Sequence, residues 1–158
     1  MISQRLRQYL DENRVPYEAH MHPVAYTAQQ VAAEEHVPGR MMAKTVIVHT
    51  GDGFAMAVLP APMRVDLAAL RSALDQPNVR LATEAEFASL FPDSETGAMP
   101  PFGNLYNLPV YVDEVLARDE EIVFNAGTHR DSIKMRFADF QRLVQPRILP
   151  LGFRAEAA

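Results

Sequence analysis

The chain has 158 residues, 48% of them hydrophobic and 22% charged, which suits one domain with a sizeable core. A formal net charge of −5 argues against a general nucleic-acid coat protein, and the lack of cysteine excludes disulfides, thiolate metal sites and cysteine nucleophiles. Because no apolar run approaches a membrane span and the first residues lack a signal peptide's apolar stretch, we expect a cytoplasmic protein with no membrane partner.

The N-terminal residues predict a helix followed by a strand. Apolar residues recur at helical spacing from Ile2 to Leu10, and Ser3 is a suitable cap, so we expect a helix over residues 3–13. An extended segment should run from Val15 to about His20. His20 and His22 would share one side of that strand, but two histidines without a third ligand do not predict a metal site.

A second helix and a hairpin follow. Residues 27–30 have the capping-box pattern, which predicts a helix over 28–36 that ends before Pro38-Gly39. Residues 41–48 and 54–59 read as two strands joined by a Gly-Asp-Gly turn. Because both are apolar throughout, they should lie in the middle of a covered sheet.

Lys44 is the exception within the first of these strands. On alternation it shares a face with Met42, Val46 and Val48. A lysine among such neighbours must either reach solvent at a strand end or meet an anion in a cleft. Both interpretations stay open on spacing alone. A small basic patch meeting a few phosphates could draw on six residues: Lys44, Arg40, Arg64, His129, Arg130 and Lys134.

The rest of the chain alternates helices and strands in the same way. We expect helices over about 67–75, 83–90 and 137–144, strands over 79–81, 108–112, 121–125 and 132–135, and a loose tail over 151–158. Residues 1–150 should therefore form one α+β domain with a mixed sheet.

Residues 94–103, Ser-Glu-Thr-Gly-Ala-Met-Pro-Pro-Phe-Gly, predict a stiff loop. Gly97 permits backbone angles that other residues avoid, and Pro100 and Pro101 fix their own φ angles. Free N–H donors could remain at Ala98, Met99, Phe102 and Gly103. The loop would suit recognition of a carbonyl or hydroxyl, or it could be a stiffened structural crossover.

Other catalytic and cofactor motifs are missing from the sequence. There is no Gly-x-Ser-x-Gly elbow and no Walker or Rossmann loop, so we expect neither a serine nucleophile nor a nucleotide cofactor. His129, Asp131 and Ser132 are not expected to form a triad, because Asp131 and Ser132 point to opposite faces of a strand.

Four motifs in order resemble a known family: Met-Ala-Lys-Thr-Val-Ile-Val from residue 42, Gly-Ala-Met-Pro-Pro-Phe-Gly from 97, Leu-Pro-Val-Tyr-Val-Asp from 108 and Phe-Asn-Ala-Gly-Thr-His from 124. They resemble the YbaK/EbsC family of free-standing aminoacyl-tRNA deacylases, related to the editing insertion of bacterial prolyl-tRNA synthetases. The resemblance covers about residues 3–146. The YbaK branch has Ser-Gly-Gly-Lys-Arg in the late turn, where this chain has Asn125-Ala-Gly-Thr-His129, so a cysteinyl-tRNAPro preference does not carry over.

The resemblance implies a compact α+β fold with a barrel-like mixed sheet and flanking helices. It also implies removal of a wrong amino acid from tRNA by ester hydrolysis, and the residues themselves predict neither a metal nor a cofactor. Lys44 stands at the family's strand lysine and is the expected catalytic residue. Gly97 and Pro101 match its Gly-x-x-x-Pro loop. The expected substrate-binding residues are Gly97, Ala98, Met99, Pro101, Phe102, Gly103 and His129.

The chemistry expected of these residues is modest, since an aminoacyl ester is already activated. Lys44 would hold a phosphate of the tRNA 3′ end or the developing oxyanion, and the loop N–H groups would orient the carbonyl. His129 could move a proton or bind the ribose, and water would be the nucleophile. The expected partners are the mischarged tRNA 3′ end and a delivering aminoacyl-tRNA synthetase. The alternatives are a non-catalytic module that binds aminoacyl-tRNA or nucleotide ends and an esterase for small molecules.

Overall fold

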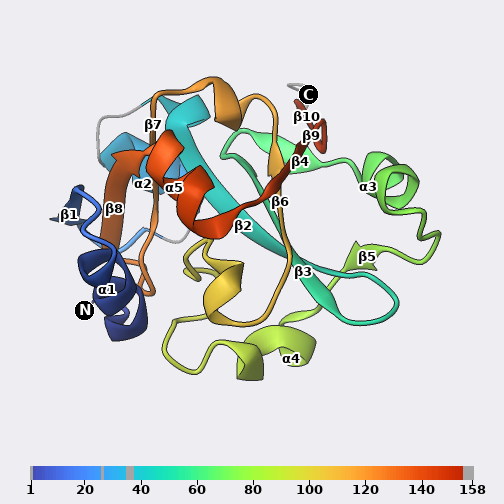
Figure 1. Cartoon of the computed structure of the whole chain (residues 1–158), viewed down its shortest axis with the longest axis horizontal. Helices are drawn as coiled ribbons and strands as arrows, with labels where there is room; N and C mark the ends of the chain where they lie inside the picture. Colours follow the sequence, from blue (N-terminus) through green and yellow to red (C-terminus); the bar gives the residue numbers. More distant parts are fainter. Residues whose placement is uncertain (1, 26, 35–37, 155–158) are drawn as a thin grey trace.

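An eight-stranded mixed sheet forms the centre of the computed structural model, which describes residues 2–25, 27–34 and 38–154 (Figure 1). The strands follow the order β1-β8-β7-β2-β3-β6-β9, with β5 paired to the end of β2, and β4 pairs with β10 in a separate ribbon. The strands are β1 (Tyr17–Met21), β2 (Met42–His49), β3 (Phe54–Pro60), β4 (Met63–Val65), β5 (Arg80–Leu81), β6 (Val110–Asp113), β7 (Glu121–Asn125), β8 (Asp131–Arg136), β9 (Arg147–Leu149) and β10 (Gly152–Arg154).

The pairing confirms the expected α+β class with a mixed sheet. β2 pairs in parallel with β7, β3 with β6, and β6 with β9, while the remaining pairs are antiparallel. Among the described residues β1 and β9 are the two ends of this strand order, and no strand pair joins them to close the sheet. The predicted hairpin is confirmed and lies in the middle, with Ala43 opposite Pro60 and His49 opposite Phe54.

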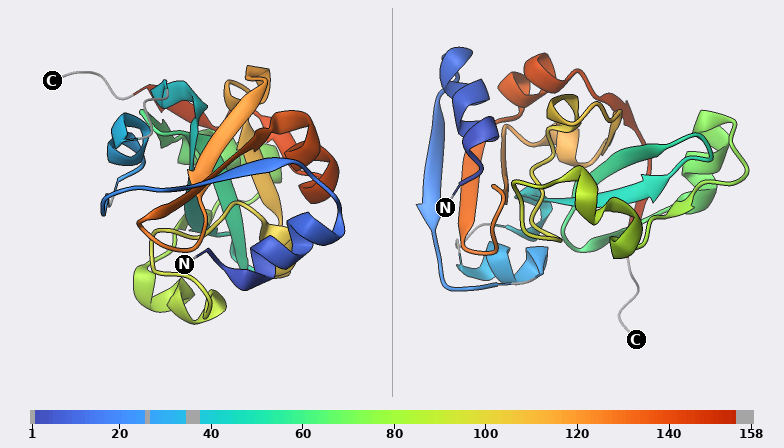
Figure 2. Two further views of the ribbon diagram at one scale, coloured as in Figure 1. Left: turned by 90° about the vertical axis from the view of Figure 1, so that its left-hand side faces the viewer. Right: turned by 90° about the horizontal axis from the view of Figure 1, so that it is seen from below.

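Helices flank the sheet on both faces. They are α1 (Gln4–Glu12), α2 (Ala28–Glu34), α3 (Leu67–Leu74), α4 (Glu84–Phe87) and α5 (Phe137–Val144), with 3₁₀ turns at Gly39–Met41, Ala88–Leu90, Gly103–Leu105 and Leu116–Arg118. α1 and α5 cover one face and α2 lies on the other (Figure 2). No helix within the described ranges is long and apolar enough to cross a membrane.

Local capping chemistry explains where the helices begin. The Ser3 hydroxyl accepts from the Leu6 N–H at 3.4 Å, as predicted for α1. In the box before α2, the Thr27 hydroxyl accepts from the Gln30 N–H at 3.1 Å, and the Gln30 side chain accepts from the Thr27 N–H at 3.2 Å. The same reciprocal box opens α4. The predicted end of α2 at residues 35–37 lies outside the described residues.

The apolar interior is divided into three clusters, and β2 contributes to all of them. Ala43 and Ile47 join the large core beneath α1 and α5. On the opposite face, Met42 packs with residues of α2, and Val48 packs with Leu70 of α3. Lys44 lies on this second face between the two smaller clusters, so its side chain has room that its apolar neighbours do not fill.

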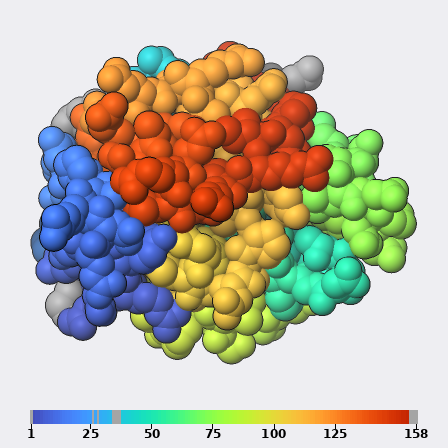
Figure 3. All heavy atoms as spheres, in the orientation of Figure 1, coloured from blue at the N-terminus to red at the C-terminus, as the bar shows by residue number. Residues whose placement is uncertain are grey.

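The expectation of a loose tail from residue 151 is wrong for residues 151–154. Leu151 is fully buried, and the N–H groups of Leu151 and Gly152 each donate to Asp113 Oδ1 at 3.0 Å. β10 then pairs antiparallel with β4. The residues that follow β8, drawn in red, run across the visible face of the molecule (Figure 3). Residues 155–158 lie outside the described ranges.

Candidate active site

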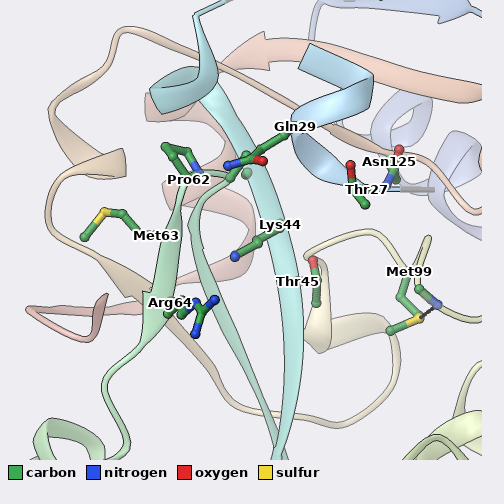
Figure 4. A pocket seen from close by; sticks show the side chains of 12 residues that line it. Thr27, Gln29, Lys44, Thr45, Pro62, Met63, Arg64, Met99 and Asn125 are labelled. Atoms are coloured by element: carbon green, nitrogen blue, oxygen red, sulfur yellow. Dashed lines mark hydrogen bonds between the residues drawn. The ribbon is translucent and has the colours of Figure 1, made fainter. Parts of the chain in front are cut away.

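A cleft opens where the parallel strands β2 and β7 separate. Their last paired residues are Ala43 and Phe124, and the next residue along each strand is Lys44 and Asn125, both of which line the cleft. Its volume is about 430 Å³. It is lined by the start of α2, the middle of β2, the segment after β3 and the loop after α4: Thr27, Gln29, Ala43, Lys44, Thr45, Ala61, Pro62, Met63, Arg64, Gly97, Met99 and Asn125 (Figure 4).

One side of the cleft carries two cations. The Lys44 amine extends toward the side where Arg64 lies (Figure 4). Burial lowers the pKa of Lys44, and the positive charge of Arg64 lowers that pKa further. Within the described part of the chain neither side chain has a carboxylate at ion-pair distance. Lys44 therefore faces a cleft that suits an anion, and it does not lie at a strand end.

The other side of the cleft is neutral. Thr27, Thr45, Met99 and Asn125 lie across from Arg64 (Figure 4). Asn125 is only 9% exposed, and its Oδ1 has no hydrogen-bond partner within the described ranges. No aspartate, glutamate, histidine, serine or cysteine is among the described residues that line the cleft. This lining can supply positive charge from Lys44 and Arg64 and positioning by neutral polar groups.

The predicted loop divides into a part at the cleft and a part in the core. Gly97 and Met99 line the cleft, whereas Ala98, Pro101, Phe102 and Gly103 are buried elsewhere. The Ala98 N–H donates to the Glu95 carbonyl at 3.0 Å, so it is not the free donor that the sequence suggested. The structure thus brings only the first half of the loop to Lys44.

Phe102 and Gly103 have packing roles in this structure. The Phe102 ring lies 5.6 Å from that of Phe124 and 5.4 Å from that of Phe140, measured between centroids. A Cβ on Gly103 would lie 2.5 Å from the Leu108 carbonyl oxygen, closer than real contacts allow. Both residues anchor the loop, and neither is among the residues that line the cleft.

His129 lies behind the loop and does not line the cleft. Its Nε2 lies 3.0 Å from the Thr96 carbonyl oxygen, and its backbone N–H donates to Glu95 Oε1 at 3.4 Å. The ring is 8% exposed. The Glu95 N–H also donates to the Gly127 carbonyl at 2.7 Å. Together these hydrogen bonds connect the loop to the β7–β8 turn. His129 is therefore placed to position Gly97.

Of the six residues considered as a basic patch, Arg40 lines a second pocket that shares Pro62 and Met63 with the cleft. Only Lys44 and Arg64 line the cleft. Arg40 pairs with Asp119 at 3.4 Å and Lys134 with Glu121 at 3.8 Å. The described residues contain no group of three or more histidines and carboxylates that could hold a metal.

The cleft includes Thr27, Gln29 and Asn125, which were not predicted site residues, and Arg64, which was considered only as one of six members of a basic patch. Arg64 follows Pro60 and Pro62, which turn the chain sharply after β3 and bring β4 beside the cleft. Asn125 follows the apolar residues 122–124 at the end of β7, which is the one local signal for it. Their convergence depends on β2 pairing with β7, which no local pattern predicts.

Replacing Gly97 by alanine should destabilise the protein by strain in the backbone. Gly97 has φ +89°, and a Cβ there would meet His129 Cε1 at 3.5 Å, an ordinary contact. The conformational penalty of about 1–2 kcal/mol should lower Tm by about 2–8 °C in thermal unfolding. Gly53→Ala is the matched control, because no atom lies within 4 Å of its added Cβ. Equal Tm values for the two variants would show that the left-handed conformation of Gly97 carries no cost.

Comparison with known proteins gives matches in sequence and in structure. A family model described as the aminoacyl-tRNA editing domain matches residues 22–143. A protein of Escherichia coli K12, the multifunctional Ser/Thr-tRNA deacylase ProXp-y, is 35% identical over 103 residues, which is 65% of this chain and 60% of that protein. The match thus spans about 60% of the length of this curated relative.

Solved structures share the fold at low sequence identity. The hypothetical protein APE2540 superposes with a TM-score of 0.86 at 18% identity, over 95% of this chain and 100% of that one. A candidate trans-editing enzyme for prolyl-tRNA synthetase superposes with a TM-score of 0.82 at 20% identity, over 98% and 97%. At these identities the likeness shows the architecture alone.

Proposed function

This chain belongs to the aminoacyl-tRNA editing domain family, and from that premise we propose that it removes wrongly attached amino acids from tRNA by hydrolysing the ester bond. The observation that carries the proposal is Lys44, a lysine in the middle of the sheet that faces the cleft beside Arg64 without a carboxylate partner in the described chain. An anionic ligand would relieve the repulsion between these two cations. The 3′ end of tRNA supplies phosphates and an ester whose carbonyl oxygen gains negative charge during hydrolysis.

Lys44 and Arg64 would have separate roles in this reaction. Lys44 extends from a central strand and is itself paired with Leu59 of β3, so its backbone is held firmly, as stabilisation of a developing oxyanion requires. Arg64 is exposed on the short strand β4, where its guanidinium can reach a phosphate of the terminal nucleotides. The cations would thus bind the nucleotide and ester parts of the substrate, leaving the neutral side for the amino acid.

Water is the nucleophile that the described lining supports. The hydroxyls available there belong to Thr27 and Thr45, and no histidine or carboxylate lies among those residues to act as their base. The Thr27 hydroxyl also accepts the N–H that caps α2. The substrate's own free ribose hydroxyl and amine would then assist proton transfer, so no acyl-enzyme should accumulate and amide-linked analogues should persist.

Seryl- and threonyl-tRNA are the substrates that we propose. The support is the E. coli relative, whose name states Ser/Thr-tRNA deacylase, together with a polar amino-acid side of the cleft. A synthetase that supplies the mischarged tRNA would be the protein partner, because one structural neighbour is described as acting for prolyl-tRNA synthetase. The reaction would take place in the cytoplasm, where tRNA is charged.

A deacylation panel tests the proposal. The purified protein is incubated with seryl-, threonyl-, alanyl- and cysteinyl-tRNA, and release of free amino acid is followed with intact-mass spectrometry of the protein. We expect fastest release from the seryl and threonyl esters, none from an amide-linked analogue, and no acylated protein. Binding of all substrates without release would instead support a non-catalytic module, and a trapped adduct on a threonine or Lys44 would overturn the water mechanism.

A further inference from the structure

We propose that Asn125 determines amino-acid specificity by hydrogen bonding to a hydroxyl on the side chain of the substrate amino acid. The inference rests on the proposed deacylase function and assigns a role to a residue so far described only as part of the cleft wall. Asn125 lines the cleft, is 9% exposed, and has no hydrogen-bond partner for Oδ1 within the described ranges. A buried polar atom left without a partner costs stability, and at a cleft a ligand can remove that cost.

The backbone at Asn125 is held rigidly. Asn125 ends β7 and pairs with Ser132 of β8, and the following Ala126 N–H donates to the Asp131 carbonyl at 3.0 Å. On its other side β7 has just separated from β2, so the side chain occupies the space that the sheet leaves open. A side chain fixed at its base and unpaired at its tip suits recognition, because little conformational freedom is lost when a ligand binds.

The chemistry of a carboxamide lets it pair with a hydroxyl in either orientation, and the side-chain hydroxyl is a group that differs between amino acids, whereas the α-amino group does not. The amide has an acceptor oxygen and a donor nitrogen, and rotation about its last torsion, which is soft, exchanges their positions. A hydroxyl donates and accepts, so it can pair with either atom. An ammonium only donates, and a methyl group does neither.

The surroundings of Asn125 agree with a short hydroxylated side chain. Thr27 lines the same side of the cleft, and Met99, which is 4% exposed, supplies an apolar wall for a β-carbon or a methyl group (Figure 4). The cations Lys44 and Arg64 come from other strands, and the view shows Arg64 across the cleft. A site that pairs with a hydroxyl discriminates strongly against the analogue that lacks it, because its own polar group is then left unsatisfied.

The test compares hydrolysis of seryl and alanyl esters carried on the same tRNA. We expect the wild-type protein to prefer the seryl ester by about 10- to 100-fold in kcat/KM. Asn125→Leu has a similar shape but no hydrogen-bonding atoms. It should lose most of that preference by slowing the seryl ester alone, with alanyl hydrolysis changed less than about 3-fold.

The controls separate recognition from folding. The ratio of seryl to alanyl hydrolysis is measured within one preparation, so it does not depend on the fraction of folded protein. Asn125→Ala also removes the amide, but without the bulk of a leucine side chain, and should show the same loss of preference. Asn78→Leu makes the same substitution at an exposed turn residue and should leave both rates unchanged. Equal slowing of both esters by Asn125→Leu, or equal wild-type rates on them, would overturn the role of Asn125 while the deacylase function stands. Hydrolysis of neither ester by wild type would overturn both proposals.

Discussion

Lys44→Ala is expected to lower the rate of deacylation by at least about 100-fold, the effect typical of removing one group that stabilises a developing oxyanion. The loss should appear in kcat, measured as amino-acid release under single-turnover conditions, since other groups also hold the substrate. Lys44→Arg should restore little, because the planar guanidinium is longer and directs its donors differently from an ammonium. Wild-type rates in Lys44→Arg would mean that only nearby positive charge matters.

Lys44→Ala should not lower the stability of the protein, and the pKa of Lys44 gives the reason. Burial and Arg64 lower that pKa in the folded state, so the unfolded chain binds the proton more tightly. The ammonium therefore lowers the free energy of unfolding at neutral pH. This destabilisation disappears only as the pH rises through the lowered pKa of the folded state toward the pKa of the unfolded chain. Lys44→Ala should keep or raise Tm at pH 7. Lys134→Ala is the control for activity, because it removes the chain's other lysine and its ion pair with Glu121. It should change the deacylation rate and Tm little. A collapse of Tm in Lys44→Ala would assign that residue a structural role.

Phe102→Ala should lower the free energy of unfolding by about 3–5 kcal/mol, the usual cost of deleting a buried aromatic ring. The ring is fully buried against Phe124 and Phe140, and its removal would leave a cavity beneath the loop. Thermal or urea unfolding measures the effect, and Phe102→Leu should cost less because more of the volume stays filled. An unchanged stability with a raised KM would instead return Phe102 to the substrate-binding role that the sequence suggested.

The parts of the fold that sequence predicted are those specified by neighbouring residues. Capping boxes at Thr27 and Thr83, and the Gly-Asp-Gly turn between two apolar runs, each depend on contacts within a few residues. The short strands β4, β9 and β10 were missed. Three residues carry too little periodicity, and β10 is defined by its distant partner β4 and by Asp113.

The candidate site was only partly predictable for the same reason. Lys44 was recognisable because a charge within an apolar strand is locally anomalous. Asn125 and Arg64 reach the cleft through the β2–β7 pairing and the path of the chain after β3, which are tertiary features. The direction of the loop side chains also followed from packing, which turned Phe102 into the core and left Met99 at the cleft.

The pairing of Arg64 with Phe153 has a consequence for synthesis of the protein on the ribosome. The hairpin that carries Lys44 emerges early and can form from adjacent residues. The strand that carries Arg64 receives its partner only after β10 has left the exit tunnel. Until β10 pairs with β4, the strand that carries Arg64 lacks the partner that holds it in the structure, so Arg64 takes its place beside Lys44 later than the hairpin forms.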